Sequence, residues 1–128
     1  MFRLWSVQRS MTRLTLVLVQ GPGKPDGDIE DRLVLTPLLT REGFLDVDAY
    51  HASAEPWLAW RMRRTAEPRA LEILRIDEGW ALQSTNSEDD PVWTFDGSVF
   101  RPGELVRLHR PNGDQYLFRI VSAETAGA

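Results

Sequence analysis

The feature that most constrains this chain is an alternation of apolar and polar residues with a period of two. Leu14, Leu16 and Leu18 share one face of an extended segment, and Leu33 and Leu35 share a face of a second segment. This period is that of a β-strand, in which successive side chains point to opposite faces. The pattern therefore predicts a fold built from sheets.

Short glycine-containing sequences separate the alternating runs. TREGF at 40–44, IDEGW at 76–80 and RPNGD at 110–114 each place glycine third in a three-residue loop. Glycine readily adopts the positive φ that ends such a loop, so the pattern is typical of a bulged β-hairpin. We expect antiparallel strands that follow one another in sequence.

A three-residue loop at 111–113 sets the register of the last hairpin. In this register Leu108 pairs with Tyr116. Two residues further along, Val106 pairs with Phe118, so one face of the hairpin is wholly apolar. A two-residue loop would mix polar and apolar residues on both faces. The polar residues expected on the opposite face are Arg107, His109 and Arg119.

The same reasoning applies to the loop at 77–79. It predicts that Ile76 lies opposite Trp80, and that Leu74 lies opposite Leu82.

The segment 46–66 allows two interpretations. One is a helix with Ser53 as N-cap and Pro56 in its first turn. The other is a strand, which separates the residues better: Leu58, Trp60 and Met62 on one face, and Trp57, Arg61 and Arg63 on the other. We favour the strand, with room for one short helix around 47–53.

These patterns predict an all-β, mostly antiparallel sandwich or small barrel of about seven to eight strands. The chain has 128 residues, which fits a single domain over 1–128. Residues 1–10 precede a second methionine, Met11, and are interpreted as an extension. The segment 122–128 is expected to fray.

Composition excludes several chemistries. The chain has no cysteine, so disulfides, thiolate metal sites and cysteine nucleophiles are absent. Only two histidines are present, too few for a three-histidine site. The net charge of −4 disfavours non-specific nucleic-acid binding. None of the serines lies in a nucleophile-elbow sequence.

The apolar run 14–19 is too short to cross a bilayer, so we expect a cytoplasmic protein without a membrane partner. Lys24 is the only lysine among 15 basic residues, a usage that suggests a GC-rich bacterial genome. The glycine-rich segment 21–28 does not match a phosphate-binding P-loop, because Pro25 follows the lysine and Pro22 removes a backbone donor.

Aromatic residues give the first candidate site. Five tryptophans are many for this length; the strand pattern places Trp60 and Trp80 in the core. Trp57 falls instead on the face of Arg61 and Arg63. Tryptophan and arginine are enriched at protein interfaces, so these three residues are the predicted partner-binding surface.

Two further clusters are weaker candidates. Arg107, His109 and Arg119 are a candidate anion site, with a solvated sheet face as the competing interpretation. The set Asp46, Asp48 and His51 suggests metal ligands or a small hydrolase site. No further ligand follows at a suitable spacing, so we predict neither a metal site nor a cofactor.

We therefore expect a non-enzymatic binding or assembly module that acts on a protein partner or forms a homo-oligomer. The alternatives are a barrel that binds a small ligand or metal, including a hydrolase, and a barrel that binds single-stranded nucleic acid.

Overall fold

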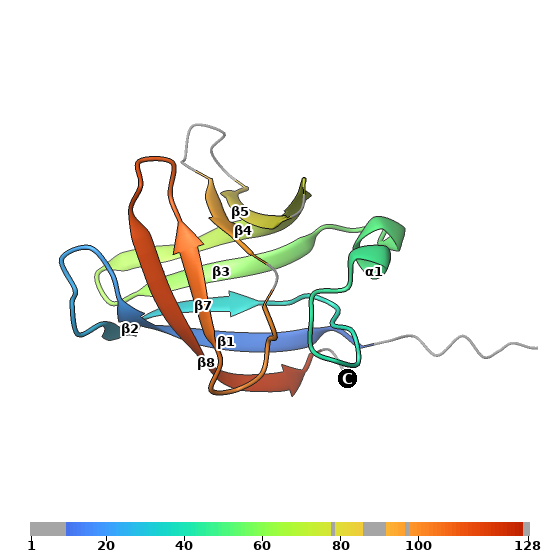
Figure 1. Cartoon of the computed structure of the whole chain (residues 1–128), viewed down its shortest axis with the longest axis horizontal. Coiled ribbons are helices and arrows are strands. Elements are labelled where there is room, and N and C mark those ends of the chain that lie inside the picture. The colour runs from blue at the N-terminus through green and yellow to red at the C-terminus, as the bar shows by residue number, and fades with distance from the viewer. Residues whose placement is uncertain (1–9, 78, 86–91, 97, 127–128) are drawn as a thin grey trace, which may run out of the picture.

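The chain forms a closed antiparallel β-barrel (Figure 1), seen in a computed structural model that describes residues 10–77, 79–85, 92–96 and 98–126. Each strand pairs with its neighbours in sequence, and the last strand pairs with the first. The all-β prediction is confirmed, as a barrel of eight strands. These are β1 (Thr12–Gln20), β2 (Asp28–Leu35), β3 (Trp57–Arg63), β4 (Ala66–Ile76), β5 (Gly79–Ser84), β6 (Trp93–Phe95), β7 (Leu105–His109) and β8 (Gln115–Thr125).

The barrel interior is filled by the alternating apolar residues that the sequence predicted. Leu14, Leu16 and Leu18 of β1 are buried, as are Leu33 and Leu35 of β2. An eight-stranded barrel has an interior just wide enough for side chains to fill or for one small ligand. Hydrophobic burial along these inward faces is the main stabilising contribution to the fold.

The hairpin between β7 and β8 has the predicted register. Leu108 pairs with Tyr116, and Val106 pairs with Phe118. The Arg110 amide donates to the Asp114 carbonyl at 2.9 Å, and this bond closes the three-residue loop. The last residue of the loop, Gly113, has a φ of 94°, which explains the need for glycine.

The turn at 40–44 also matches the prediction. The Thr40 amide donates to the Phe44 carbonyl at 2.7 Å, and Gly43 has a φ of 101°.

The register between β4 and β5 differs from the prediction. Gly79 pairs directly with Ile76, so two residues rather than three form the loop, and Asp77 has a φ of 36°. The expected pairs of Ile76 with Trp80 and of Leu74 with Leu82 are wrong; Ile73 pairs with Leu82 instead. β4 also pairs with β3, where Ile73 faces Trp57. That second neighbour fixes the inward face of β4, which a single hairpin cannot do.

The segment 57–63 is a strand, as favoured, but its faces are reversed. Trp57 is buried at 1% exposure, whereas Trp60 is 43% exposed on the outside. The predicted core position of Trp60 is therefore wrong. β2 determines this orientation: its inward Leu35 pairs with Ala59, and its inward Leu33 pairs with Arg61. Residues opposite each other share a face, so Arg61 must point inward.

One short helix, α1 (Val47–Ala52), lies between β2 and β3, within the predicted range. Asp46 is its N-cap and accepts a hydrogen bond from the Ala49 amide at 3.0 Å. Ser53 is its C-cap, so the alternative helix that begins at Ser53 is wrong. The ring of Tyr50 packs edge-on against the buried indoles of Trp57 and Trp80.

The two ends of the barrel differ. Figure 1 shows α1 at one end and the β1–β2 and β3–β4 hairpin loops at the other. At the α1 end, Trp57 and Trp80 stack with centroids 6.0 Å apart. Phe95 and Phe100 pack together in the same core.

The C-terminal segment is more ordered than expected. Residues 122–125 belong to β8, where Ala123 pairs with Leu14 and Thr125 pairs with Thr12. The prediction of a frayed tail is wrong for these residues, because pairing with β1 closes the barrel. Most of the predicted extension, 1–9, and the last two residues lie outside the described part of the chain.

Candidate arginine site at one end of the barrel

The inward face of β3 changes character along the barrel. It begins with Trp57 and Ala59, which are buried at the α1 end, and continues with Arg61 and Arg63 toward the hairpin loops. Opposite Arg61 on β4 stands Arg69. Strand alternation thus brings cationic side chains to one end of the barrel, where Arg61 is half-buried and Arg63 and Arg69 are exposed.

Arg61 is held by a buried carboxylate. Its Nε and Nη2 donate to the two carboxylate oxygens of Asp31, on β2, at 3.1 and 2.8 Å. The side chains are 12% and 6% exposed, respectively. A bidentate pair of this kind combines charge with fixed geometry. It compensates the Arg61 charge and fixes the direction of its guanidinium.

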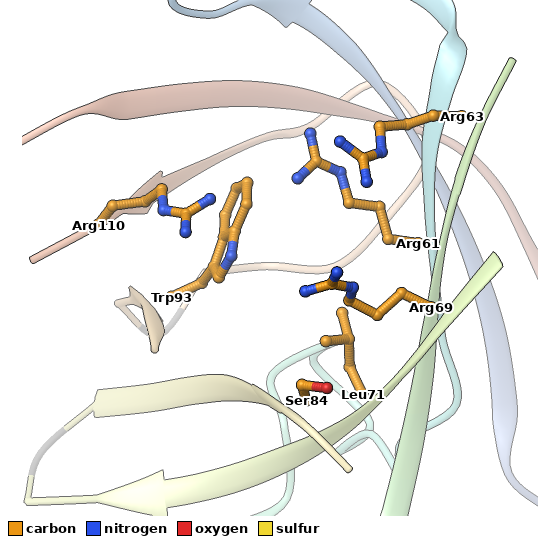
Figure 2. Close-up of a pocket in the computed structure, with 7 residues that line it drawn as sticks. All are labelled: Arg61, Arg63, Arg69, Leu71, Ser84, Trp93 and Arg110. Atoms are coloured by element: carbon orange, nitrogen blue, oxygen red, sulfur yellow. The ribbon is translucent and has the colours of Figure 1, made fainter. Parts of the chain in front are cut away.

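Trp93 of β6 separates two guanidinium groups. The Cζ atoms of Arg61 and Arg110 each lie 4.7 Å from the centre of the Trp93 ring. Figure 2 shows Arg61, Arg63 and Arg69 on one side of the indole and Arg110 on the other. Tyr116 packs against the same indole, with ring centroids 4.5 Å apart. These cation–π contacts hold positive charge beside an apolar surface.

These residues line a cavity of about 170 Å³, which we call the arginine pocket. Among the residues that the structure describes, its lining contains four arginines and no carboxylate, although the chain carries a net charge of −4. The lining residues are Arg61, Arg63, Arg69, Leu71, Ser84, Trp93 and Arg110 (Figure 2).

A second cavity of about 420 Å³ adjoins the first, because both are lined by Arg61 and Arg63. We call it the mixed pocket, since its lining carries both signs of charge together with apolar groups. The other lining residues are Leu18, Pro22, Lys24, Asp28, Asp31, Arg64, Thr65 and Tyr116.

The charges of the mixed pocket are largely paired. The Lys24 ammonium donates to the Asp28 carboxylate, which also accepts from the Glu30 amide at 2.9 Å. The hydrogen bond from Lys24, followed by that from the Glu30 amide, lowers the pKa of Asp28 below its usual value of 3.8.

Among the described residues, Arg63 and Arg110 differ from Arg61 in forming no ion pair with a carboxylate. Within the described ranges, neither guanidinium forms an ion pair or a hydrogen bond. Partial desolvation and the nearby charge of Arg61 lower the pKa of Arg63, although it stays protonated. The Asp31 carboxylate acts on Arg63 in the opposite sense and partly offsets these two effects.

The predicted partner-binding residues divide between interior and pocket. Trp57 lies in the core, so Trp57, Arg61 and Arg63 do not form an outer surface. Trp57 and Arg61 share the inward face of β3, whereas Arg63 follows a register irregularity and is exposed at the end of the strand. Arg61 and Arg63 line the arginine pocket, whereas Trp57 lies at the other end of β3.

The predicted anion residues share the outer face of β7 and β8 but do not face one another. Arg107 pairs with Leu117 and donates to the Gln115 side chain at 3.1 Å. Arg119 pairs with Leu105, and His109 pairs with Gln115. Neither of the two cavities described above includes any of the three.

The third set, Asp46, Asp48 and His51, lies on or beside α1. Asp46 caps the helix, Asp48 is in its first turn, and His51 packs against Tyr50. In the part of the chain that the structure describes, no three acidic or histidine side chains gather as metal ligands.

Four of the charged and aromatic residues of the site were missed from the sequence: Asp31, Arg69, Trp93 and Arg110. Arg110 was noticed only as the first residue of a turn. The signal that could have found Asp31 is its alternation with Leu33 and Leu35, which places a carboxylate on an inward face. The convergence of the other residues required the closure of the barrel.

Comparison of the chain with protein-family models, with curated proteins and with solved structures finds no match. None of the helical residues that the structure describes forms a segment of the length and apolarity that a bilayer crossing requires. The function must therefore be argued from the site.

Proposed function

We propose that this protein is a binding barrel that takes a small anionic ligand in the arginine pocket. The observation that supports this proposal most directly is the lining of that pocket, whose described residues include four arginines and no carboxylate. Arginine presents a planar fork of donors that suits carboxylate and phosphate groups.

Electrostatics favours an anion here for two reasons. Arg63 and Arg110 form no ion pair with a carboxylate in the described residues, so a bound anion could contact both guanidinium groups directly. Both also lie beside low-dielectric groups, since Trp93 and Leu71 line the same cavity. A charge interaction is stronger beside such groups than in open solvent.

At least one donor of the arginine pocket is already held in place before a ligand binds. Arg61 is held on two sides, by Asp31 and by the Trp93 ring. A preorganised donor loses little conformational entropy on binding.

A thermal-shift experiment tests the proposal. Small carboxylates, phosphate and sulfate should raise the melting temperature of the wild-type protein at low salt, because a ligand that binds only the folded state stabilises it. Arg63→Gln and Arg110→Gln should each reduce the shift. Arg107→Gln, on the outer face, is the matched control and should keep it. A wild-type protein that no small anion stabilises would refute the proposal.

A second candidate function is self-association, and a different surface supports it. Leu58, Trp60 and Met62 form an exposed apolar strip along the outside of β3, at 45%, 43% and 37% exposure. We call it the outer strip. Exposed patches of large apolar groups are typical of interaction surfaces.

Charge favours a second copy of this chain as the occupant. Met62 pairs with Arg32 at one end of the outer strip, and Leu58 pairs with Glu72 at the other. A two-fold axis through Trp60 would bring Arg32 of each copy against Glu72 of the other. Light scattering should then report a dimer for the wild type and a monomer for Trp60→Glu. A wild type that stays monomeric at high concentration would exclude this candidate.

A further inference from the structure

The two cavities together define a ligand more closely than the arginine pocket alone. Resting on the proposed anion-binding function, we infer that the ligand is a small phosphate monoester with a non-aromatic, polar body. Its phosphate would occupy the arginine pocket, and its body would extend past Arg61 and Arg63 into the mixed pocket.

The charge of the head group follows from the pairing of the arginines. Asp31 compensates Arg61 through two hydrogen bonds. Within the described residues neither Arg63 nor Arg110 forms an ion pair, although Asp31 also acts on Arg63 at longer range. Two guanidinium groups therefore line the arginine pocket without a direct carboxylate contact. A monocarboxylate would compensate only one of them. A phosphate monoester carries a charge of about −1.5 to −2 at neutral pH and matches both.

The shape of the head group follows from Trp93. This indole is only 7% exposed, and guanidinium groups lie against it at 4.7 Å on both sides (Figure 2). Its faces are occupied, so it cannot stack on an aromatic ligand. Its role is to hold Arg61 and Arg110 apart. A compact tetrahedral anion fits a 170 Å³ cavity lined by several guanidinium forks.

The character of the body follows from the mixed pocket. Its lining offers carboxylate acceptors at Asp28 and Asp31, the donors Lys24 and Arg64, and the hydroxyl of Thr65. Such a lining complements hydroxyl groups, which both donate and accept. An anionic body would meet the two carboxylates, and a large apolar body would bury paired charges at a cost. A polyol-like body is therefore favoured.

Calorimetric titration of the intact protein at low salt tests this inference. The probes are acetate, sulfate, inorganic phosphate and glycerol 3-phosphate. At neutral pH, sulfate and both phosphates should bind at least about tenfold more tightly than acetate, because they compensate both guanidinium groups. Glycerol 3-phosphate should bind more tightly than inorganic phosphate, since only the ester reaches the mixed pocket.

A pH comparison isolates the charge of the ligand. Lowering the pH from about 7.5 to about 5.5 should reduce the affinity for glycerol 3-phosphate about fourfold, because its second ionisation lies near pH 6. Sulfate stays doubly charged over this range, so its affinity should not change. A change in sulfate affinity with pH would therefore show that the binding site of the protein itself has changed.

Variants localise the effect. Arg63→Gln and Arg110→Gln should each reduce the affinity for sulfate and for glycerol 3-phosphate by about tenfold, as expected for the loss of one charge-assisted hydrogen bond. Arg107→Gln is the control and should leave both affinities unchanged. Circular dichroism of each variant establishes that the barrel is intact.

The outcomes separate this inference from the proposed function. If acetate binds as tightly as sulfate and glycerol 3-phosphate, the pocket binds anions but does not select phosphate, and the inference is overturned. Equal affinity for inorganic phosphate and its glycerol ester would overturn the assignment of the body. If no probe binds at about 10 mM, a concentration that detects even very weak affinity, the proposed function itself fails.

Discussion

Asp31 and Arg61 form a two-point ion pair across β2 and β3, at a place where the apolar interior of the barrel ends. Both side chains are almost buried, at 6% and 12% exposure. A buried pair is costly to break, because the remaining charge is left without compensation. The pair therefore contributes to both the stability of the barrel and the geometry of the arginine pocket.

We predict that Asp31→Ala lowers the free energy of unfolding by about 3 kcal/mol or more, since Arg61 would remain as a buried, unpaired charge. Urea denaturation measures the change. The matched control is Glu30→Gln, which breaks an exposed pair with Arg64 at 3.6 Å and should cost no more than about 0.5 kcal/mol. Similar costs for the two variants would contradict the buried position of Asp31.

The double variant Asp31→Leu with Arg61→Met should recover much of the stability lost in Asp31→Ala, because apolar residues of similar size often replace a buried ion pair at little cost. Any loss of unfolding free energy that remains in the double variant would then be due to altered packing. If the double variant is as unstable as Asp31→Ala, the ion pair must stabilise the fold by more than the cost of leaving one charge unpaired.

Truncation of the two tryptophans of β3 should lower the free energy of unfolding by different amounts. Trp57 stacks on Trp80 in the core, so Trp57→Ala should lower the free energy of unfolding by about 3–5 kcal/mol. Trp60 is 43% exposed, so Trp60→Ala should cost about 1 kcal/mol or less. Chemical denaturation followed by circular dichroism compares them. The reverse order would restore the orientation of β3 that the sequence suggested.

Two glycines with positive φ should differ in their tolerance of a methyl group. A Cβ on Gly27 would lie 2.4 Å from the Leu18 carbonyl oxygen, whereas one on Gly113 would meet nothing within 4 Å. Gly113→Ala should cost about 1–2 kcal/mol of backbone strain. Gly27→Ala should add about 1–3 kcal/mol for the steric conflict. Thermal unfolding of the two variants measures this difference, and equal losses would contradict the close approach at Gly27.

The pKa of Asp28 gives a prediction in acid. Because the folded protein lowers this pKa below 3.8, chiefly through the Lys24 hydrogen bond, the carboxylate stabilises the fold above that value. The contribution is lost as the pH falls through the folded-state pKa. Lys24→Gln should raise the pKa of Asp28 in a carbon-detected NMR titration. Arg64→Gln, which removes the smallest of the lowering contributions, should raise it less.

The sequence prediction agreed best with the structure where residues within one hairpin are enough to set the strand register. The turn at 110–114 fixes the pairing of Leu108 with Tyr116, because loop length and the burial of one face require the same register. The pairing of β4 with β5 was wrong for the opposite reason. β4 has two neighbours, and the face that it presents to the interior must suit both.

Pairing between distant strands also explains why the arginine pocket was not predicted from the sequence. Arg61 was named from the sequence, but as part of an outer surface with Trp57. Its inward orientation depends on Leu33 across the β2–β3 pair and on Asp31, which lies 30 residues away in the sequence. Trp93 reaches the same cavity from β6, and Arg110 reaches it from the β7–β8 loop. Local periodicity carries no information about such distant neighbours.

The sequence by itself determined that this chain forms antiparallel strands joined by glycine turns, because alternation and turn chemistry are properties of neighbouring residues. Only the tertiary structure decided which faces of β3 and β4 point inward, because each of these strands must match two neighbours in the closed barrel. That closure placed Trp57 in the core, Trp60 on the outside, and four arginines around one cavity.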